Sequence, residues 1–180
     1  MAIYPPTSRI WWREPVAKME IIWTAIAFVW GLVMFGTMVA WHVWGEQNLA
    51  NEAYRVNPEA YLAKTEAMAE KYTVREEGDS GVPVVHPPPG GDIYMLARLW
   101  QWWPILELEK GKSYRLHLSS VDWQHGFSLV PTNINIQVHP GYEMVITVRP
   151  SEAGTFGIIC NEFCGIGHHL MASKIHVVDK

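Results

Sequence analysis

The chain has 180 residues, of which 18% are charged, and its formal net charge at pH 7 is −4. This length allows one compact domain plus an appendage. The weakly acidic charge and the absence of a run of basic residues argue against a nucleic-acid-binding protein.

The first predicted element is a membrane anchor over residues 19–45. The stretch Ile21 to Gly45 contains no Lys, Arg, Asp or Glu, and a spanning helix needs about 20 such residues. A secretory signal peptide has a shorter apolar core, so we expect a retained anchor; a buried helix of a soluble protein is the alternative. Positive charges precede the stretch, at Arg9, Arg13 and Lys18. The positive-inside rule then predicts a cytoplasmic lead over residues 1–18, with everything after Gly45 outside the cytoplasm.

A polar connector is expected over residues 46–92. Within it, Asn57 and Pro58 have the residue types of a helix N-cap and a first helical position. Apolar residues then recur at helical spacing, which predicts one short amphipathic helix ending near Tyr72.

Residues 93–180 show the pattern of an all-β domain. Short apolar runs alternate with turns that contain glycine or proline, which is typical of a β-sandwich or barrel. The expected strands cover residues 93–103, 105–109, 114–118, 134–138, 144–148, 155–159 and 174–178.

A set of soft ligands follows the strand at 155–159, in the stretch Cys160-Asn-Glu-Phe-Cys164-Gly-Ile-Gly-His168-His-Leu-Met171. Thiolate, imidazole and thioether groups together favour copper. Two thiolates can bridge two metal ions, and each ion then needs a nitrogen ligand. His168 supplies one, and His125 is the upstream candidate for the other. A disulfide and a structural zinc site are the alternatives.

This motif, together with Asp122-x-x-His125, resembles the binuclear copper (Cu-A) domain of subunit II of haem–copper cytochrome c oxidases. The resemblance covers the whole chain and is strongest to the B-branch, single-anchor type. It implies an all-β cupredoxin-like Greek-key barrel attached to one N-terminal transmembrane helix. The ligand His125 would then lie at one end of the barrel, beside the loop that carries the other ligands.

The resemblance also assigns the ligand roles. Cys160 and Cys164 would bridge two copper ions, and His125 and His168 would bind one ion each. Met171 and the backbone carbonyl of Glu162 would be the weak axial ligands. His169 is interpreted as a neighbour of the ligand rather than a ligand, and the remaining histidines, including His117, as non-ligands.

Two further roles rest on the same resemblance. Electrons are expected to enter at an aromatic strand, with Trp100 preferred over Trp102; ordinary core packing is the alternative for both. Glu20, at the cytoplasmic edge of the anchor, is expected to open a proton-uptake route. An acid at a helix start is also favourable without any such function.

The implied function is electron acceptance for a terminal cytochrome c oxidase. The chain would take electrons from a cytochrome c or similar periplasmic carrier and pass them to the haem–copper subunit I, which reduces oxygen to water and translocates protons. The chain itself would bind two copper ions in its outer, periplasmic domain and would be anchored by one helix in a bacterial or archaeal cell membrane. A Cu-A-type nitric oxide reductase subunit and a membrane-anchored copper carrier are the alternative functions.

Overall fold

The computed structural model describes residues 15–45 and 52–179. The expected cytoplasmic lead, with Arg9 and Arg13, falls almost entirely outside the described residues. The chain divides into two compact units, Met1–Gln47 and Asn48–Lys180.

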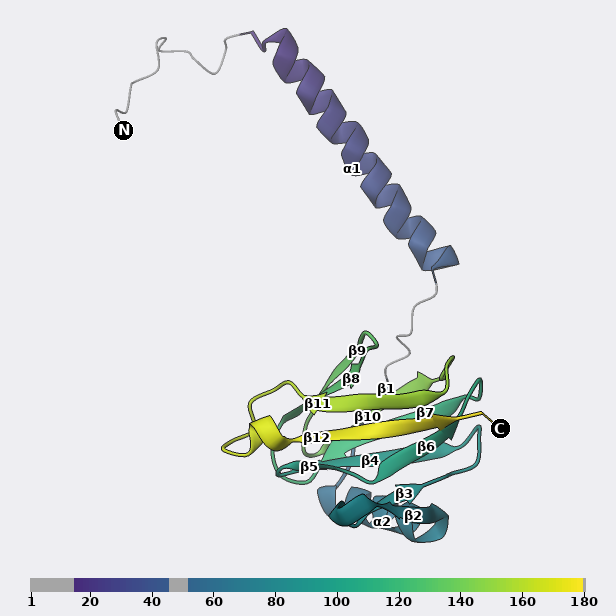
Figure 1. Ribbon diagram of the computed structural model, residues 1–180. Coiled ribbons are helices and arrows are strands. Elements are labelled where there is room, and N and C mark those ends of the chain that lie inside the picture. The colour runs from purple at the N-terminus through teal and green to yellow at the C-terminus, as the bar shows by residue number, and fades with distance from the viewer. Residues whose placement is uncertain (1–14, 46–51, 180) are drawn as a thin grey trace. The chain divides into compact units, whose positions relative to one another are not determined.

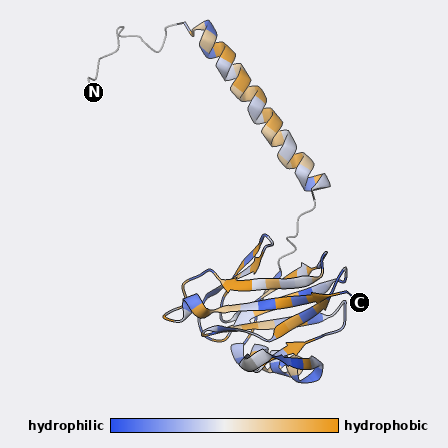
Figure 2. Cartoon of the chain, viewed as in Figure 1, coloured by the Kyte–Doolittle hydropathy of each residue, from blue (hydrophilic) through white to orange (hydrophobic). Residues whose placement is uncertain are grey.

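The first unit contains helix α1 (Lys18–Trp44). Its 27 residues include a window of mean hydropathy 1.9, so α1 is long and apolar enough to cross a membrane. Figure 2 shows apolar residues along its length. At its start, the Glu20 carboxylate accepts a hydrogen bond from the backbone N–H of Ala17 at 2.9 Å. Glu20 therefore satisfies one of the N–H groups that a helix N-terminus leaves without a partner.

The described part of the second unit is an all-β sandwich with one α-helix (Figure 1). The first sheet has the order β1 (Glu52–Arg55), β10 (Tyr142–Val148), β7 (Tyr114–Ser120), β4 (Asp92–Arg98) and β5 (Gln101–Trp103). The second sheet has the order β2 (Thr73–Glu77), β3 (Val82–Val85), β6 (Ile105–Glu109), β12 (Ala172–Val178), β11 (Gly154–Cys160), β8 (His125–Val130) and β9 (Ile134–Val138).

The all-β class is confirmed, but the expected barrel is two open sheets. Each sheet keeps two edge strands, β1 and β5 in the first and β2 and β9 in the second. Most neighbours are antiparallel, and the pairs β4–β7, β6–β12 and β3–β6 are parallel. A core of fully buried side chains includes Trp102, Leu106, Leu116, Phe127 and Ile158. Burying each such side chain contributes about 1.5–3 kcal/mol, which stabilises the sandwich that carries the loops.

Helix α2 (Pro58–Tyr72) begins as the sequence predicts. The Asn57 side chain accepts hydrogen bonds from the N–H groups of Glu59 and Ala60, at 2.8 and 3.1 Å. The buried Tyr61 hydroxyl then reaches the first sheet, where it lies 3.0 Å from the carbonyl oxygen of Met95 and 2.9 Å from that of His117. These contacts fix α2 against β4 and β7.

The expected connector differs from the structure. Strand β1 pairs with β10, and β3 pairs with β6, so three strands and a helix between residues 52 and 85 belong to the sandwich. Strands β1 and β2 have no buried residue. Their sequences therefore lack the apolar alternation by which strands are predicted.

The strand expected over residues 93–103 is a hairpin of β4 and β5, in which Leu96 lies opposite Trp103. The chain turns at Leu99 and Trp100. The backbone N–H of Leu99 donates to the Asp122 carboxylate instead of a neighbouring strand, at 2.6 Å.

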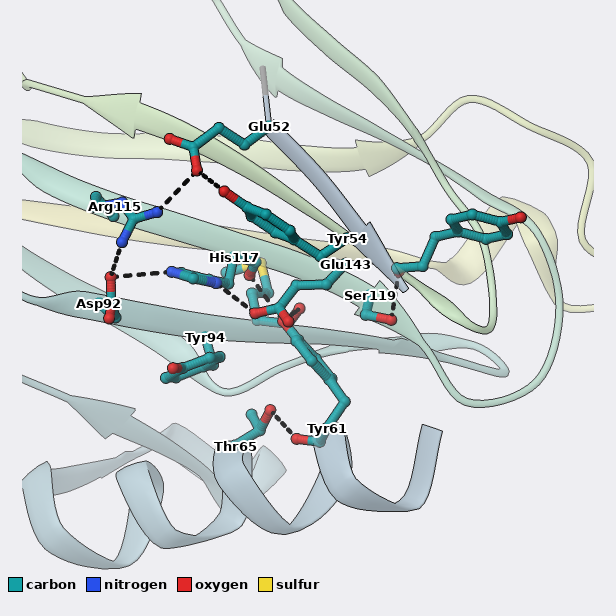
Figure 3. A network of polar contacts seen from close by, with 12 residues as sticks. Glu52, Tyr54, Tyr61, Thr65, Asp92, Tyr94, Arg115, His117, Ser119 and Glu143 are labelled. Atoms are coloured by element: carbon teal, nitrogen blue, oxygen red, sulfur yellow. Dashed lines mark hydrogen bonds and ion pairs between the residues drawn. The ribbon is translucent and has the colours of Figure 1, made fainter. Parts of the chain in front are cut away.

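A polar network crosses the first sheet (Figure 3). The buried His117 ring contacts the Glu143 carboxylate through Nδ1 and lies 3.1 Å from Asp92 through Nε2. Arg115 pairs with both Asp92 and Glu52, each at 3.1 Å. His117 is thus a buried, paired residue on β7, and the network connects β1 with β4, β7 and β10.

Candidate metal centre

The loop between β11 and β12, which contains Cys164 and His168, lies at one end of the second sheet (Figure 1). His125 begins β8 and Cys160 ends β11, and these two strands are neighbours. Cys164 lies in the loop between β11 and β12, and His168 begins the short helix η3 (His168–Leu170). Met171 then leads into β12. Two strand ends and one loop therefore bring together residues that are 35 positions apart.

The sulfur atoms form the centre of this group. Cys160 Sγ lies 3.8 Å from Cys164 Sγ, and Cys164 Sγ lies 3.8 Å from Met171 Sδ. All three residues are buried, and both cysteines are free. A disulfide bond would need an S–S distance of about 2.05 Å, so the structure does not adopt the disulfide alternative.

The two candidate histidines lie beside different cysteines. His125 Nδ1 lies 4.0 Å from Cys160 Sγ, and His168 Nδ1 lies 3.6 Å from Cys164 Sγ. Ligand atoms of His125, Cys160 and Cys164 all lie within 4.8 Å of one another. His169 is exposed, which agrees with its interpretation as a neighbour.

Glu162 presents its backbone rather than its side chain to the sulfurs. Its carbonyl oxygen accepts from the Cys160 thiol at 3.2 Å. Its carboxylate points elsewhere and accepts from Gln137 Nε2 at 2.9 Å. This position suits the weak-ligand role expected for the carbonyl.

Asp122 orients the His125 ring. Its Oδ1 atom lies 2.8 Å from His125 Nε2, which leaves Nδ1 facing Cys160. Burial raises the pKa of the Asp122 carboxyl, but hydrogen bonds from His125 and from the N–H groups of Trp123 and Leu99 outweigh burial and lower this pKa below its ordinary value. The sequence motif contains Asp122, but no role was predicted for it. A carboxylate three residues before a ligand histidine was the available signal.

Without metal, Cys164 keeps its proton at neutral pH. Burial, followed by its hydrogen bond with Cys160, raises the pKa of the Cys164 thiol to about 11. Metal binding must therefore displace a proton from this residue. Two thiols, two imidazoles and a thioether, turned toward one another and mostly buried, make a donor set that fits copper.

Comparisons with known proteins identify the family of the chain. A cytochrome c oxidase subunit 2 from Thermus thermophilus is 36% identical over 110 residues, which covers 58% of this chain and 82% of the relative. The chain belongs to the cytochrome c oxidase subunit 2 family. A heme-copper oxidase subunit 2 from Aeropyrum pernix is 24% identical over 213 residues, covering 97% of this chain and 87% of the relative. No protein-family model matches the chain.

The fold of this subunit 2 family member is also similar to that of a chain in a solved structure. A chain of a heme-copper terminal oxidase dimer, determined by cryo-electron microscopy, superposes with a TM-score of 0.57 at 21% identity. The match covers 89% of this chain and all of the other. The fold is cupredoxin-like, with the two sheets open rather than closed into a barrel.

The two expected electron-accepting tryptophans lie in different environments. Trp100 is 40% exposed, and its indole N–H donates to the carbonyl oxygen of Cys164 at 3.0 Å. Trp102 is 1% exposed and packs edge-on against Phe127 and the His125 ring. The core-packing alternative therefore describes Trp102, whereas Trp100 joins the surface to the ligand loop.

Proposed function

We propose that this chain is the electron-accepting subunit of a terminal cytochrome c oxidase. It takes electrons from a cytochrome c or similar periplasmic carrier at a binuclear copper centre. It passes them to the haem–copper subunit I, which reduces oxygen to water and translocates protons. The convergence of His125, Cys160 and Cys164 in a buried cluster carries this proposal.

Each ligand residue has a separate task. Cys160 and Cys164 would bridge the two copper ions, while His125 and His168 would each hold one. Met171 and the Glu162 carbonyl would complete the site as weak ligands. When bound, such a copper pair would share each accepted electron between its two ions, so the charge on either ion would change little.

Hydrogen bonds within the chain hold these ligands in place. The backbone N–H of Cys160 donates to the carbonyl of Met171 at 3.1 Å, which closes the ligand loop. Inside the loop, the N–H of His168 donates to the carbonyl of Gly165 at 3.1 Å. Asp122 fixes the His125 ring from behind. Fixed ligands favour electron transfer because little rearrangement accompanies each change of charge.

Trp100 is the proposed point where electrons enter. It is the one of the two candidate tryptophans that a protein donor can touch, and its hydrogen bond ends on the backbone of a bridging cysteine. We place this face outside the cytoplasm, with α1 as a single-pass anchor whose N-terminus is cytoplasmic.

Glu20 is proposed to serve proton uptake by subunit I. Glu20 and Trp44 are separated by 24 residues of α1, or about 36 Å along the helix axis, so they would lie at opposite edges of a membrane. Glu20→Gln should slow oxygen turnover of the assembled complex without changing the rate of copper reduction. Wild-type turnover at every pH would leave Glu20 with its helix-start role alone.

Stopped-flow reduction tests the electron-accepting role. The copper-loaded full chain in detergent should be reduced rapidly by a ferrous cytochrome c. Trp100→Phe should slow this reaction but leave reduction by a small inorganic reductant unchanged, because only the protein donor needs the surface contact. Trp102→Phe, buried, is the matched comparison. Equal small effects of both substitutions would support core packing for both, and no reduction by any cytochrome c would contradict the proposed function.

The alternative functions are separated by two observations. A copper carrier needs ligands that release the metal, and burial of the two cysteines, His125 and Met171 argues against this. A nitric oxide reductase subunit would share the same copper domain. The identity and haems of the co-purifying large subunit therefore decide between the oxidase and the nitric oxide reductase.

A further inference from the structure

We propose that the Leu99–Trp100 turn is a brace that holds the metal-ligand loop in position from outside, which makes Trp100 a positioning residue. This role concerns the shape of the loop and is distinct from electron acceptance. It rests on the proposed copper centre only for its purpose, since the contacts join residues of the chain itself.

One arm of the brace is the Trp100 indole. Its N–H donates to the Cys164 carbonyl at 3.0 Å, and its ring lies on the backbone of the next residues. A Cβ atom added at Gly167 would lie 2.3 Å from Trp100 Cδ2, whereas one added at Gly165 would make ordinary contacts of 3.6 Å. Since the φ angle of Gly167 is −88°, any residue could adopt its backbone conformation. Glycine is needed at position 167 because the indole is there.

The other arm is the backbone of Leu99. Its N–H donates to Asp122 Oδ2 at 2.6 Å, and the other oxygen of the same carboxylate lies 2.8 Å from His125 Nε2. One two-residue turn therefore contacts both the residue that orients His125 and the loop that carries Cys164. Leu99 acts on His125 through Asp122, and Trp100 acts on the loop that carries Cys164 and His168.

The large apolar side chains of the loop contribute little to holding it in place. Phe163, Ile166 and Leu170 are 80%, 90% and 71% exposed, so these side chains do not anchor the loop to the core. Two short-range hydrogen bonds lie inside the loop, from His168 to Gly165 and from Leu170 to Gly167, and the bond from Cys160 to Met171 closes its base. Trp100, from a separate strand pair, supplies a contact across the loop.

Hydrogen exchange in the metal-free full chain tests the brace. In Trp100→Phe, which keeps a ring but loses the N–H, the His168 and Leu170 amides should exchange about fivefold faster, the usual effect of losing one net hydrogen bond. Amides of β7 should be unchanged. Trp103→Phe is the matched control, because Trp103 lies on the same hairpin under Arg98 and makes no such contact. Unchanged loop exchange in Trp100→Phe, or equal acceleration by Trp103→Phe, would overturn the proposal.

A paired substitution tests the ring contact separately. Gly167→Ala should displace the loop and shift the copper absorption bands, because the added methyl meets the indole. Adding Trp100→Ala should restore the bands toward those of Trp100→Ala alone, since the obstacle is gone. Additive effects would overturn the ring contact. Trp100→Phe should retain the wild-type bands but lose copper to a chelator about fivefold faster. These outcomes are distinct from failure of the copper assignment, in which the wild-type chain would show no such bands.

Discussion

Cys164 contacts three of the other candidate ligands through its sulfur, as Cys160 does. Its sulfur lies 3.8 Å from Cys160 Sγ, 3.6 Å from His168 Nδ1 and 3.8 Å from Met171 Sδ. Its carbonyl also accepts the Trp100 N–H. We therefore expect substitutions at this position to affect the metal, the loop and the adjoining tryptophan together.

The ligands should rank by bond strength. Cys160→Ser and Cys164→Ser should each abolish the shared-electron centre, since each sulfur would bridge both ions. Met171→Leu should retain copper but shift the reduction potential, because an axial thioether is a weak ligand. Copper content and potentiometric titration of the full chain distinguish these effects. Loss of copper in Met171→Leu as complete as in Cys160→Ser would reverse the ranking.

The two adjacent histidines should differ sharply. His168 Nδ1 faces Cys164, while His169 is exposed. His168→Ala should remove the wild-type copper spectrum, and His169→Ala should leave it nearly intact. The absorption spectra of both copper-loaded variants provide the measurement. A spectrum lost in His169→Ala and kept in His168→Ala would exchange their roles.

Among single residues, the sequence predicted those whose spacing forms a motif. The motif located the cysteines, both histidines and Met171 because four of these five residues share one loop. It did not reveal the Asp122–Leu99 contact or the fit of Gly167 under Trp100. Both join residues far apart in the chain, and their geometry depends on where the β4–β5 hairpin turns.

Among the elements, the edge strand β2 is held to β12 by polar side chains. Glu77 accepts from Lys174 Nζ at 2.7 Å and lies 3.3 Å from His176 Nε2. The hydrogen bond from Lys174 lowers the pKa of Glu77; burial opposes this effect, and a hydrogen bond from His176 adds to it. The contact between Glu77 and Lys174 reaches across two strands of the second sheet, since β3 and β6 lie between β2 and β12.

This contact should make stability depend on pH in one direction. Because the folded-state pKa of Glu77 is lowered, its contribution is fully present above the unfolded pKa of about 4.3 and is lost as pH falls through the folded pKa. Near neutral pH, Glu77→Gln should lower the melting temperature, and the free energy of unfolding should fall by less than about 1 kcal/mol because the pair is partly exposed. The difference from wild type should vanish at low pH. Glu76→Gln, at an exposed neighbour, is the control; an equal effect there, or a difference that grows in acid, would contradict the assignment.

Helix α2 shows which elements a sequence can predict and which it cannot. Asn57 and Pro58 marked its start correctly because capping is local chemistry. Strands β1 and β2 were missed because both are edge strands without buried side chains. The short strand β3 was missed as well, and its pairing with β6 joins residues about twenty positions apart. Their identity as strands depends on distant partners.

For the whole molecule, we expect the compact unit Asn48–Lys180, rather than residues 93–180 alone, to be the part that folds as one domain. A fragment starting at Asp92 would lack β1, α2, β2 and β3, which exposes the pairing edges of β10 and β6. It would also lose Tyr61, Val84 and Val85, all fully buried, each worth about 1.5–3 kcal/mol.

The Asn48–Lys180 fragment should therefore fold and bind copper, while the Asp92–Lys180 fragment should be largely unfolded. The expected loss is comparable to the entire stability of a typical domain, about 5–15 kcal/mol. Circular dichroism during heating measures both fragments. Melting temperatures within a few degrees of each other would show that the preceding segment is only a connector.

Electron paramagnetic resonance of the copper-loaded full chain tests the central claim most directly. Two bridging thiolates and one nitrogen ligand per ion should let one unpaired electron interact equally with two copper nuclei. The account predicts a seven-line hyperfine pattern and two copper ions per chain by elemental analysis. A four-line pattern with one copper per chain, or a silent spectrum with bound zinc, would contradict it.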